Sequence, residues 1–254
     1  MTEENLSQIK EQVYKDPRPA EHFDRYHHRS RTTDPNWVYE AVRIATTLHA
    51  WIFFRTRGVA ADKVPARGPV ILAPNHFSFM DHFFMGVALR RKVRFMAKSQ
   101  LFKPPMEWIY SPGGVFPVRR GFADEEAFIT ARSILARGGA IAMYSEGGRS
   151  RTGKLAESVR PGIGRLALQS GATVVPIAIH GSSKVRNWKR LRFPKVTVLY
   201  GDPIRWDVVE EPTRDQQQAV ANEIFAEVRK LYAQLEAIGR RGVAAARRRE
   251  LRRA

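Results

Sequence analysis

Short apolar runs, separated by longer stretches of mixed polarity, make up the middle of this sequence. The runs occupy residues 70–73, 93–97, 115–118, 140–144, 173–179 and 196–200. Continuous apolar runs this short are typical of strands buried on both faces, as in parallel sheets covered by helices. Because the stretches between them have helical character, the pattern predicts an α/β domain over residues 58–239, with a largely parallel central sheet flanked by helices.

A helical apolar pattern covers residues 36–57, ahead of the first predicted strand. The side chains that recur on one face are Trp37, Ala41, Ile44, Leu48 and Ile52. Aromatic residues stand at both ends of this segment, as in helices that lie in the interface of a bilayer. We therefore predict an amphipathic helix at the membrane surface, although a helix packed on the domain core would have the same periodicity.

The first 35 residues are predominantly polar. They are rich in charge and in histidine, and Pro17, Pro19 and Pro35 interrupt any regular element. A segment with so few apolar residues buries too little surface to offset the entropy of ordering it. We therefore predict that residues 1–35 form an extension with little core of its own.

The C-terminal part predicts one long helix followed by a basic tail. Thr213 and Gln216 have the spacing of a capping box, and apolar residues then recur at helical spacing as far as Gly239. A glycine in this place is typical of a helix end. Residues 240–254 are rich in arginine and suit an anionic surface.

The charge balance indicates a polyanionic partner. The 254 residues include 43 lysines and arginines against 25 aspartates and glutamates, which gives a formal net charge of +18. Nucleic acid and an anionic lipid surface both offer phosphates to such a chain. No recognised nucleic-acid-binding motif is present, so we expect an anionic membrane surface and no nucleic acid. No apolar run is long enough to span a bilayer, which predicts a peripheral protein at the cytoplasmic face of the membrane.

A candidate catalytic pair, His76 and Asp81, follows the first predicted strand of the domain. Residues five apart on one helix are rotated by about 140° and do not face each other, so His76 should lie in a turn with Asp81 at the start of the next helix. There the carboxylate would orient the imidazole and raise its basicity, so that His76 could deprotonate an attacking hydroxyl. The sequence has no cysteine, which excludes a cysteine-linked acyl intermediate.

Three further blocks follow along the chain. The first ends in two adjacent arginines, whose planar guanidinium groups suit a phosphate. The second is a Ser-Glu-Gly-Gly-Arg-Ser loop after a strand, at the kind of strand end where open α/β sheets bind ligands. The third is mostly strand core and contains one proline. These blocks are residues 113–121, 145–150 and 174–181.

In order and spacing, the four blocks resemble the glycerolipid acyltransferase family, typified by 1-acyl-sn-glycerol-3-phosphate acyltransferases, whose first block is Asn-His-x4-Asp. The resemblance covers roughly residues 58–202. It implies that His76 is the general base, that Asp81 is its partner and that Pro176 lines the acyl-donor region. The residues that it implies for binding the acceptor phosphate are Arg119, Glu146, Gly147 and Arg149.

The resemblance implies transfer of a fatty acyl chain from acyl-CoA or acyl carrier protein to 1-acyl-sn-glycerol-3-phosphate, which gives phosphatidic acid. A thioester is already activated, so the reaction needs these co-substrates and no further cofactor or metal. The chain has Gly148 where the third family block usually has threonine, and Pro117 where the second usually has another residue. Both departures concern the acceptor, so glycerol-3-phosphate, another lysophospholipid or a glycolipid stays open.

Three other classes of function fit parts of the sequence. Residues 148–154 match the core of a phosphate-binding loop, but Leu155 stands where the magnesium-binding serine or threonine belongs. His76, Asp81 and His82 could ligate zinc, but they lack a further matched ligand. A non-enzymatic basic module that binds membranes would explain the charge and leave the pair of His76 and Asp81 without a role.

Overall fold

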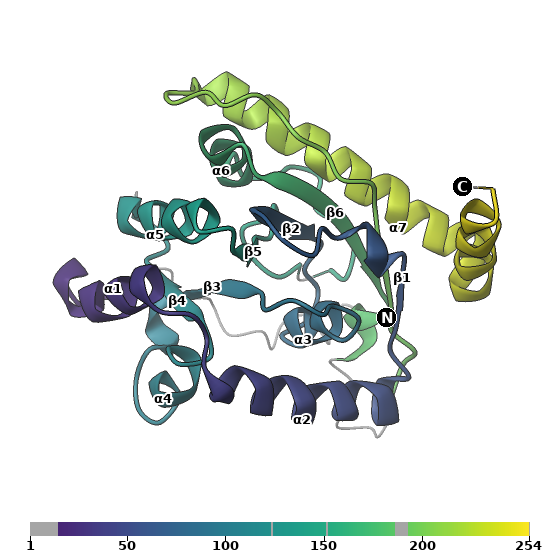
Figure 1. The fold of residues 1–254 in the computed structure, drawn as a ribbon, viewed down its shortest axis with the longest axis horizontal. Helices are drawn as coiled ribbons and strands as arrows, with labels where there is room; N and C mark the ends of the chain where they lie inside the picture. Colours follow the sequence, from purple (N-terminus) through teal and green to yellow (C-terminus); the bar gives the residue numbers. More distant parts are fainter. Residues whose placement is uncertain (1–14, 123, 151, 186–192, 254) are drawn as a thin grey trace.

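Strands from the whole length of the domain form one sheet at the centre of the protein (Figure 1). This computed structural model describes residues 15–122, 124–150, 152–185 and 193–253. In the described residues the strand order is β1-β7-β6-β2-β5-β3-β4. The strands are β1 (Arg57–Val59), β2 (Val70–Pro74), β3 (Arg94–Lys98), β4 (Val115–Val118), β5 (Ala140–Ala142), β6 (Thr173–His180) and β7 (Thr197–Tyr200).

The predicted largely parallel sheet is confirmed. Every neighbouring pair of strands is parallel except β6 and β7, which are antiparallel. Each of the six predicted runs overlaps a strand, and among the described strands the sequence pattern missed only the short edge strand β1. A three-residue edge strand has too few residues to produce a periodic signal.

Helices cover both faces of the sheet. Successive side chains of a strand point to opposite faces, so Ile71 of β2 packs in one core and Leu72 in the other. The helices over the Ile71 face are α5 (Glu125–Ala136), α6 (Gly162–Ser170) and α7 (Arg214–Leu251). The helices over the Leu72 face are α2 (Trp37–Phe54) and α3 (Asp81–Gly86). Short helices in the connections are η3 (Ala61–Lys63), η4 (Ser99–Leu101) and α4 (Glu107–Tyr110).

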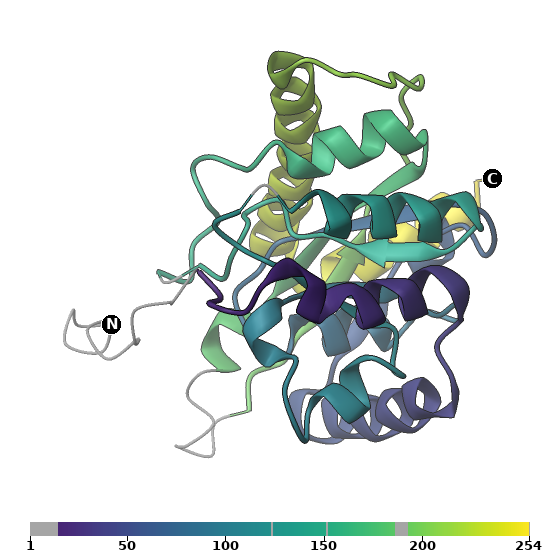
Figure 2. The ribbon, with the colours of Figure 1, turned by 90° about the vertical axis from the view of Figure 1, so that its left-hand side faces the viewer.

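The segment that precedes the domain is folded, so the prediction of an extension with little core is wrong for residues 15–35. Its elements are η2 (Ala20–Phe23) and α1 (Asp24–Thr32). Helix α1 lies beside α5, as both views of the ribbon show (Figures 1 and 2). Phe23 and Tyr26 are buried against Phe102. A few large aromatic side chains supply contacts that the average composition of the segment does not indicate. The rest of the predicted extension, residues 1–14, lies outside the described part of the chain.

Helix α7 begins as predicted and continues beyond its predicted end. The side chain of Thr213 accepts from the N–H of Gln216, and the side chain of Gln216 accepts from the N–H of Thr213. Gly239 has φ 62° and ψ 179°, a conformation that suits glycine and that kinks the helix. The helix then resumes and ends at Leu251, so the glycine marks a bend and not a terminus.

Most of the predicted arginine-rich tail, residues 240–251, is the end of helix α7 and packs on the domain. Val243 and Ala244 are buried in a cluster with residues of β1, β6 and β7. Arg240 donates to the carbonyl oxygens of Arg55 and Val196 at 2.7 and 2.5 Å. Several of the arginines nevertheless face solvent: Arg241, Arg248, Arg249, Arg252 and Arg253.

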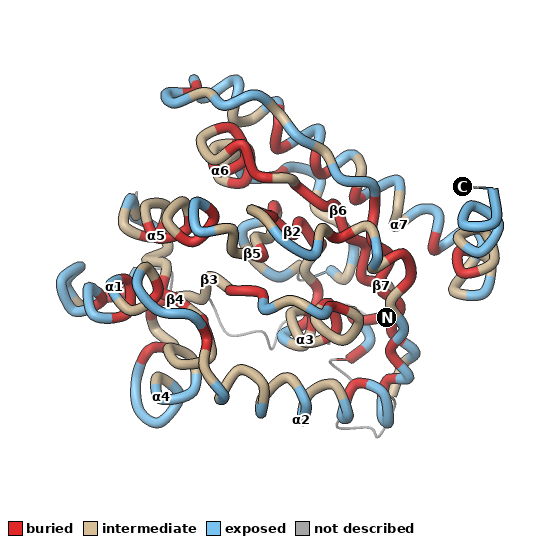
Figure 3. The backbone as a smooth tube through the Cα atoms, viewed as in Figure 1, coloured by how far each residue is buried: buried red, intermediate tan, exposed pale blue. Residues whose placement is uncertain are grey.

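Helix α2 presents its predicted apolar row to the outside of the molecule (Figure 3). Trp37 is 74% exposed and Ile52 is 68% exposed, whereas Ala50 and Phe54 are the buried residues of the helix. A helix is present over Trp37–Phe54, and its apolar row does not pack on the domain core. Within the described ranges, no helix combines the length and the apolar character needed to cross a membrane. Contact of α2 with a bilayer stays a prediction.

Helices α6 and α7 touch at Gly164, where a Cβ atom would lie 1.9 Å from the carbonyl oxygen of Gln217. Because no side chain fits there, we expect Gly164→Ala to lower the free energy of unfolding by about 3 kcal/mol, measured by chemical denaturation. Gly86→Ala places its Cβ in open space and should change this free energy by less than about 1 kcal/mol. Equal losses in the two variants would contradict the close packing.

Candidate active site

Residues from three sequence blocks meet at the carboxyl edge of the sheet. His76, Arg120 and Arg149 follow β2, β4 and β5, which run in the same direction. All three side chains line one pocket of about 250 Å³. This edge is where ligands of open α/β sheets bind, because the loops that follow parallel strands converge there.

His76 and Asp81 form the contact that the sequence predicts. Asp81 is the first residue of α3 and is fully buried, and its Oδ2 atom lies 3.0 Å from Nδ1 of His76. The same oxygen accepts hydrogen bonds from the backbone N–H groups of Phe77 and Ser78, both at 2.7 Å. When Nδ1–H donates to the carboxylate, Nε2 of the imidazole carries the lone pair and can accept a proton.

Asn75, which the sequence analysis did not single out as a site residue, fixes the position of the turn. Its Nδ2 group donates to the carbonyl oxygen of Ile179 at 3.1 Å, and its Oδ1 accepts from the N–H of Ile179 at 2.7 Å. The fully buried amide therefore joins the end of β2 to the end of β6. In the sequence, the only indication of this role is that Asn75 directly precedes His76.

The surroundings of His76 favour a neutral imidazole. Its ring stacks on the ring of Tyr144, with the centroids 3.9 Å apart and an interplanar angle of 22°. Burial lowers the pKa of His76 below its usual 6.5, and the nearby Asp81 carboxylate opposes this shift. An imidazole that is neutral near pH 7 is in the state that a general base requires.

The loop after β5 holds the backbone of His76 on both sides. Oε1 of Glu146 accepts from the N–H of His76 at 2.9 Å, and the N–H of Ser150 donates to the carbonyl oxygen of His76 at 2.8 Å. Gly147 has φ 67°, and a Cβ atom there would lie 2.8 Å from Cγ of Arg160. The predicted residues Glu146 and Gly147 thus shape the turn around His76.

Three cations give the His76 pocket a positive charge: Lys98, Arg120 and Arg149. Burial lowers the pKa of Lys98, and the two arginines lower it further. Because the three side chains line one small pocket, they can bind one anion together. Arg149 was predicted for an acceptor phosphate, and Arg120 is the member of the arginine pair that the structure adds.

Of the predicted substrate-binding residues, Arg149 lines this pocket, whereas Glu146, Gly147, Arg119 and Pro176 do not. The guanidinium group of Arg119 donates to the carbonyl oxygen of Arg18 at 3.1 Å and lies 4.3 Å from the ring centroid of Phe122. Pro176 is buried within β6 opposite Ala73. Neither residue lines the pocket that contains His76, so the structure supports neither the phosphate contact of Arg119 nor the acyl-donor contact of Pro176.

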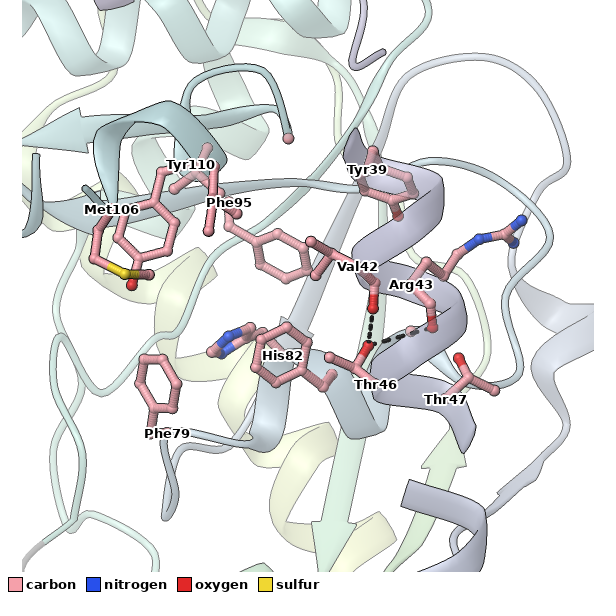
Figure 4. A pocket seen from close by; sticks show the side chains of 15 residues that line it. Tyr39, Val42, Arg43, Thr46, Thr47, Phe79, His82, Phe95, Met106 and Tyr110 are labelled. Atoms are coloured by element: carbon pink, nitrogen blue, oxygen red, sulfur yellow. Dashed lines mark hydrogen bonds between the residues drawn. The ribbon is translucent and has the colours of Figure 1, made fainter. Parts of the chain in front are cut away.

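An apolar cavity of about 270 Å³ (Figure 4) shares part of its lining with the His76 pocket. Its walls come from the inner side of α2, from α3 and from the region of α4, with Val42, Phe79 and Met106 among the lining side chains. Burial lowers the pKa of His82 to about 3, so this side chain is neutral at pH 7. The residues that line both cavities are Phe79, His82, Phe95, Tyr110 and Val115.

Residues 56–180 match the sequence model of the Acyltransferase family, so this segment is an acyltransferase domain. The matched segment contains every site residue from His76 to Arg149. The pair of His76 and Asp81 therefore lies in a domain of the predicted class.

Two curated plant proteins and one solved structure are similar to the chain. A chloroplast 1-acyl-sn-glycerol-3-phosphate acyltransferase of Arabidopsis thaliana is 26% identical over 147 residues, which are 56% of this chain and 41% of the relative. A chloroplast 1-acyl-sn-glycerol-3-phosphate acyltransferase of Brassica napus is 25% identical over 167 residues, which are 64% of this chain and 46% of that relative. The chain thus matches less than half of either relative. The crystal structure of the 1-acyl-sn-glycerophosphate acyltransferase PlsC from Thermotoga maritima has the same fold, with TM-score 0.62 and 20% identity over 84% of this chain and 88% of that chain.

The structure also bears on two alternative readings of the sequence. The ring of His82 contacts Phe79 and Phe95, and within the described ranges no three potential metal ligands of the histidine, aspartate and glutamate types are grouped together. A phosphate-binding loop leads directly into a helix. Here the helix that follows Lys154 begins only at Gly162, so residues 148–154 do not have the structure of such a loop.

Glu146 gives the folded protein a pH dependence. Burial raises its pKa from 4.5 to about 7, so between these values the folded protein holds a proton that the unfolded chain releases. The stabilising contribution of this proton is complete below about pH 4.5 and is lost as the pH rises to about 7. Glu146→Gln keeps an acceptor for the N–H of His76 and removes the titration. We expect the free energy of unfolding of Glu146→Gln, relative to wild type, to rise by about 2 kcal/mol between about pH 4.5 and pH 8.

Urea denaturation of both proteins at the two pH values measures this difference. Other titrating groups are common to the two proteins and cancel in the comparison. A difference that stays constant across the range would show that Glu146 does not titrate there.

Proposed function

We propose that this chain transfers a fatty acyl group from a thioester donor to the free hydroxyl of 1-acyl-sn-glycerol-3-phosphate, which forms phosphatidic acid. The observation that carries the proposal is the contact of His76 with Asp81 inside a cationic pocket that adjoins an apolar cavity. One site thus combines a base, a place for a phosphate and a place for a fatty chain. The plant relatives are named for this activity, which supports the same acceptor.

The proposed chemistry needs one base and no covalent bond to the protein. Nε2 of His76 takes the proton of the acceptor hydroxyl while its oxygen attacks the thioester carbonyl, and a tetrahedral intermediate forms. Its collapse completes the ester, breaks the carbon–sulfur bond and expels the thiolate, which takes the proton back from the imidazolium. Asp81 orients the ring and stabilises the imidazolium. The cations beside His76 favour the negative charge that develops on the carbonyl oxygen.

The pocket favours an acceptor that bears a phosphate. Lys98, Arg120 and Arg149 line it together with His76, and a phosphate can pair with several such donors at once. A glycolipid without phosphate would bring no anionic group to these cations. The cationic pocket therefore favours a lysophospholipid over a glycolipid, and the apolar cavity under α2 suits the acyl chain of the donor or the acceptor.

We further propose that the protein docks on an anionic membrane, on its cytoplasmic face, through the outer row of α2. The row exposes Trp37, Ile44, Leu48 and Ile52 to solvent, while the opposite side of the same helix lines the apolar cavity. Membrane interfaces favour aromatic and aliphatic side chains in such a row. Docking in this orientation would bring the fatty substrates to the cavity without passage through water.

Substitution of the base tests the enzymatic proposal. We expect His76→Ala and Asp81→Asn to lower the rate of phosphatidic acid formation by about 10²-fold to 10⁴-fold, because each removes part of the proton transfer. The assay supplies vesicles, radiolabelled acyl-coenzyme A and lysophosphatidic acid. His180→Ala, a change of another histidine that does not line the pocket, should retain activity, and a His76→Ala protein as active as wild type would refute the role of the base.

Substitution of the outer row tests the docking. We expect Leu48→Ser combined with Ile52→Ser to weaken sedimentation with anionic vesicles by more than about tenfold, because two exposed apolar side chains of the row are lost. The matched control is Val208→Ser combined with Ile238→Ser, which removes exposed apolar side chains elsewhere. Equal binding by both double variants would exclude α2 as the contact.

A further inference from the structure

A second, polar cavity lies on the other side of the loop that carries Glu146. Its volume is about 880 Å³, and its walls come from residues 157–161 and from the first half of α7. Three arginines line it: Arg160, Arg214 and Arg229. The acids in its walls are Glu146 and Glu157, and burial raises the pKa of Glu146 to about 7, which reduces its negative charge at neutral pH.

The three arginines carry charge that no carboxylate neutralises. Within the described part of the chain, none of the three forms an ion pair. Arg229 is held in place, since it donates to the carbonyl oxygens of Ala156 and Glu157, both at 2.7 Å. Gly147 allows Arg160 to approach the loop closely, because any Cβ atom there would meet the stem of Arg160. The cavity is therefore cationic, and hydrogen bonds to the backbone hold Arg229 in its wall.

The two cationic cavities flank one short loop and share no lining residue. Arg149 lines the His76 pocket, and Glu146, three positions earlier, lines the polar cavity. Acyl transfer brings together two substrates that each bear phosphate. The acceptor carries its phosphate on the same glycerol as the reacting hydroxyl, so that phosphate belongs in the His76 pocket. The phosphates of a coenzyme A thioester are separated from its reacting carbon by the pantetheine arm, so they require a second, remote cationic site.

We propose that the polar cavity lined by Arg160, Arg214 and Arg229 binds the nucleotide phosphates of an acyl-coenzyme A donor. This inference rests on the proposed acyl transfer and identifies its donor. Coenzyme A carries a diphosphate and a separate ribose phosphate, which three arginines can share. A carrier protein presents one phosphodiester on a convex surface, whereas this site is concave and of a size that encloses a small molecule.

Donor preference tests the inference through the enzymatic reaction. In vesicle assays, wild type should use acyl-coenzyme A far better than the same acyl group on pantetheine, which lacks the nucleotide. Arg160→Gln combined with Arg214→Gln should reduce this preference at least tenfold, since two charge-assisted contacts are lost. The control is Arg67→Gln combined with Arg90→Gln, which removes the same charge from exposed positions outside this cavity. A preference that is unchanged in the first double variant overturns the proposal.

Direct binding tests the site even if no acyl transfer is observed. Calorimetry with adenosine 3′,5′-bisphosphate should show binding to the full-length wild type and at least tenfold weaker binding to Arg214→Glu. An acid in the first turn of α7 favours the helix, so this variant should stay folded, and circular dichroism checks it. Equal binding to both proteins, or none to wild type, overturns the nucleotide site. Binding of adenosine 3′,5′-bisphosphate without any acyl transfer would contradict the proposed function but support the nucleotide site.

Discussion

The Oδ2 atom of Asp81 holds together the turn on which the candidate site depends. It receives the imidazole of His76 and the N–H groups of Phe77 and Ser78, so it fixes the catalytic ring and the backbone beside it at once. Three donors thus share one oxygen of the buried carboxylate. Because Asp81 is the first residue of α3, the position of this helix sets the orientation of the imidazole, and a displacement of α3 would displace the ring.

Contacts from other strands keep that turn in place. Asn75 ties it to the end of β6, and the loop after β5 holds the backbone of His76 through Glu146 and Ser150. The same loop separates the two cationic cavities, with Arg149 facing one and Glu146 facing the other. A short segment of backbone thus positions the base and divides the space available to anionic groups. One loop can have both roles because the loops that follow parallel strands converge at one edge of the sheet.

Helix α2 links this site to the surface of the molecule. Its inner side closes the apolar cavity, and its outer row of aromatic and aliphatic residues faces solvent. A helix in water normally hides such a row, so its exposure needs an apolar partner. In the proposed docking, a bilayer is that partner, and the cavity for a fatty chain lies directly behind the helix that touches the lipid.

The sequence by itself determined the features that depend on near neighbours. Buried parallel strands are continuous apolar runs, and the contact of His76 with Asp81 follows from six consecutive residues at a strand-to-helix turn. Tertiary structure decided what depends on distant segments: the choice of Arg120 over Arg119 for the pocket, and the distance of Pro176 from it. It also decided that α1 and residues 240–251 pack on the domain. A strand end can direct either of two adjacent arginines inward, and only the packing of the neighbouring segments selects one.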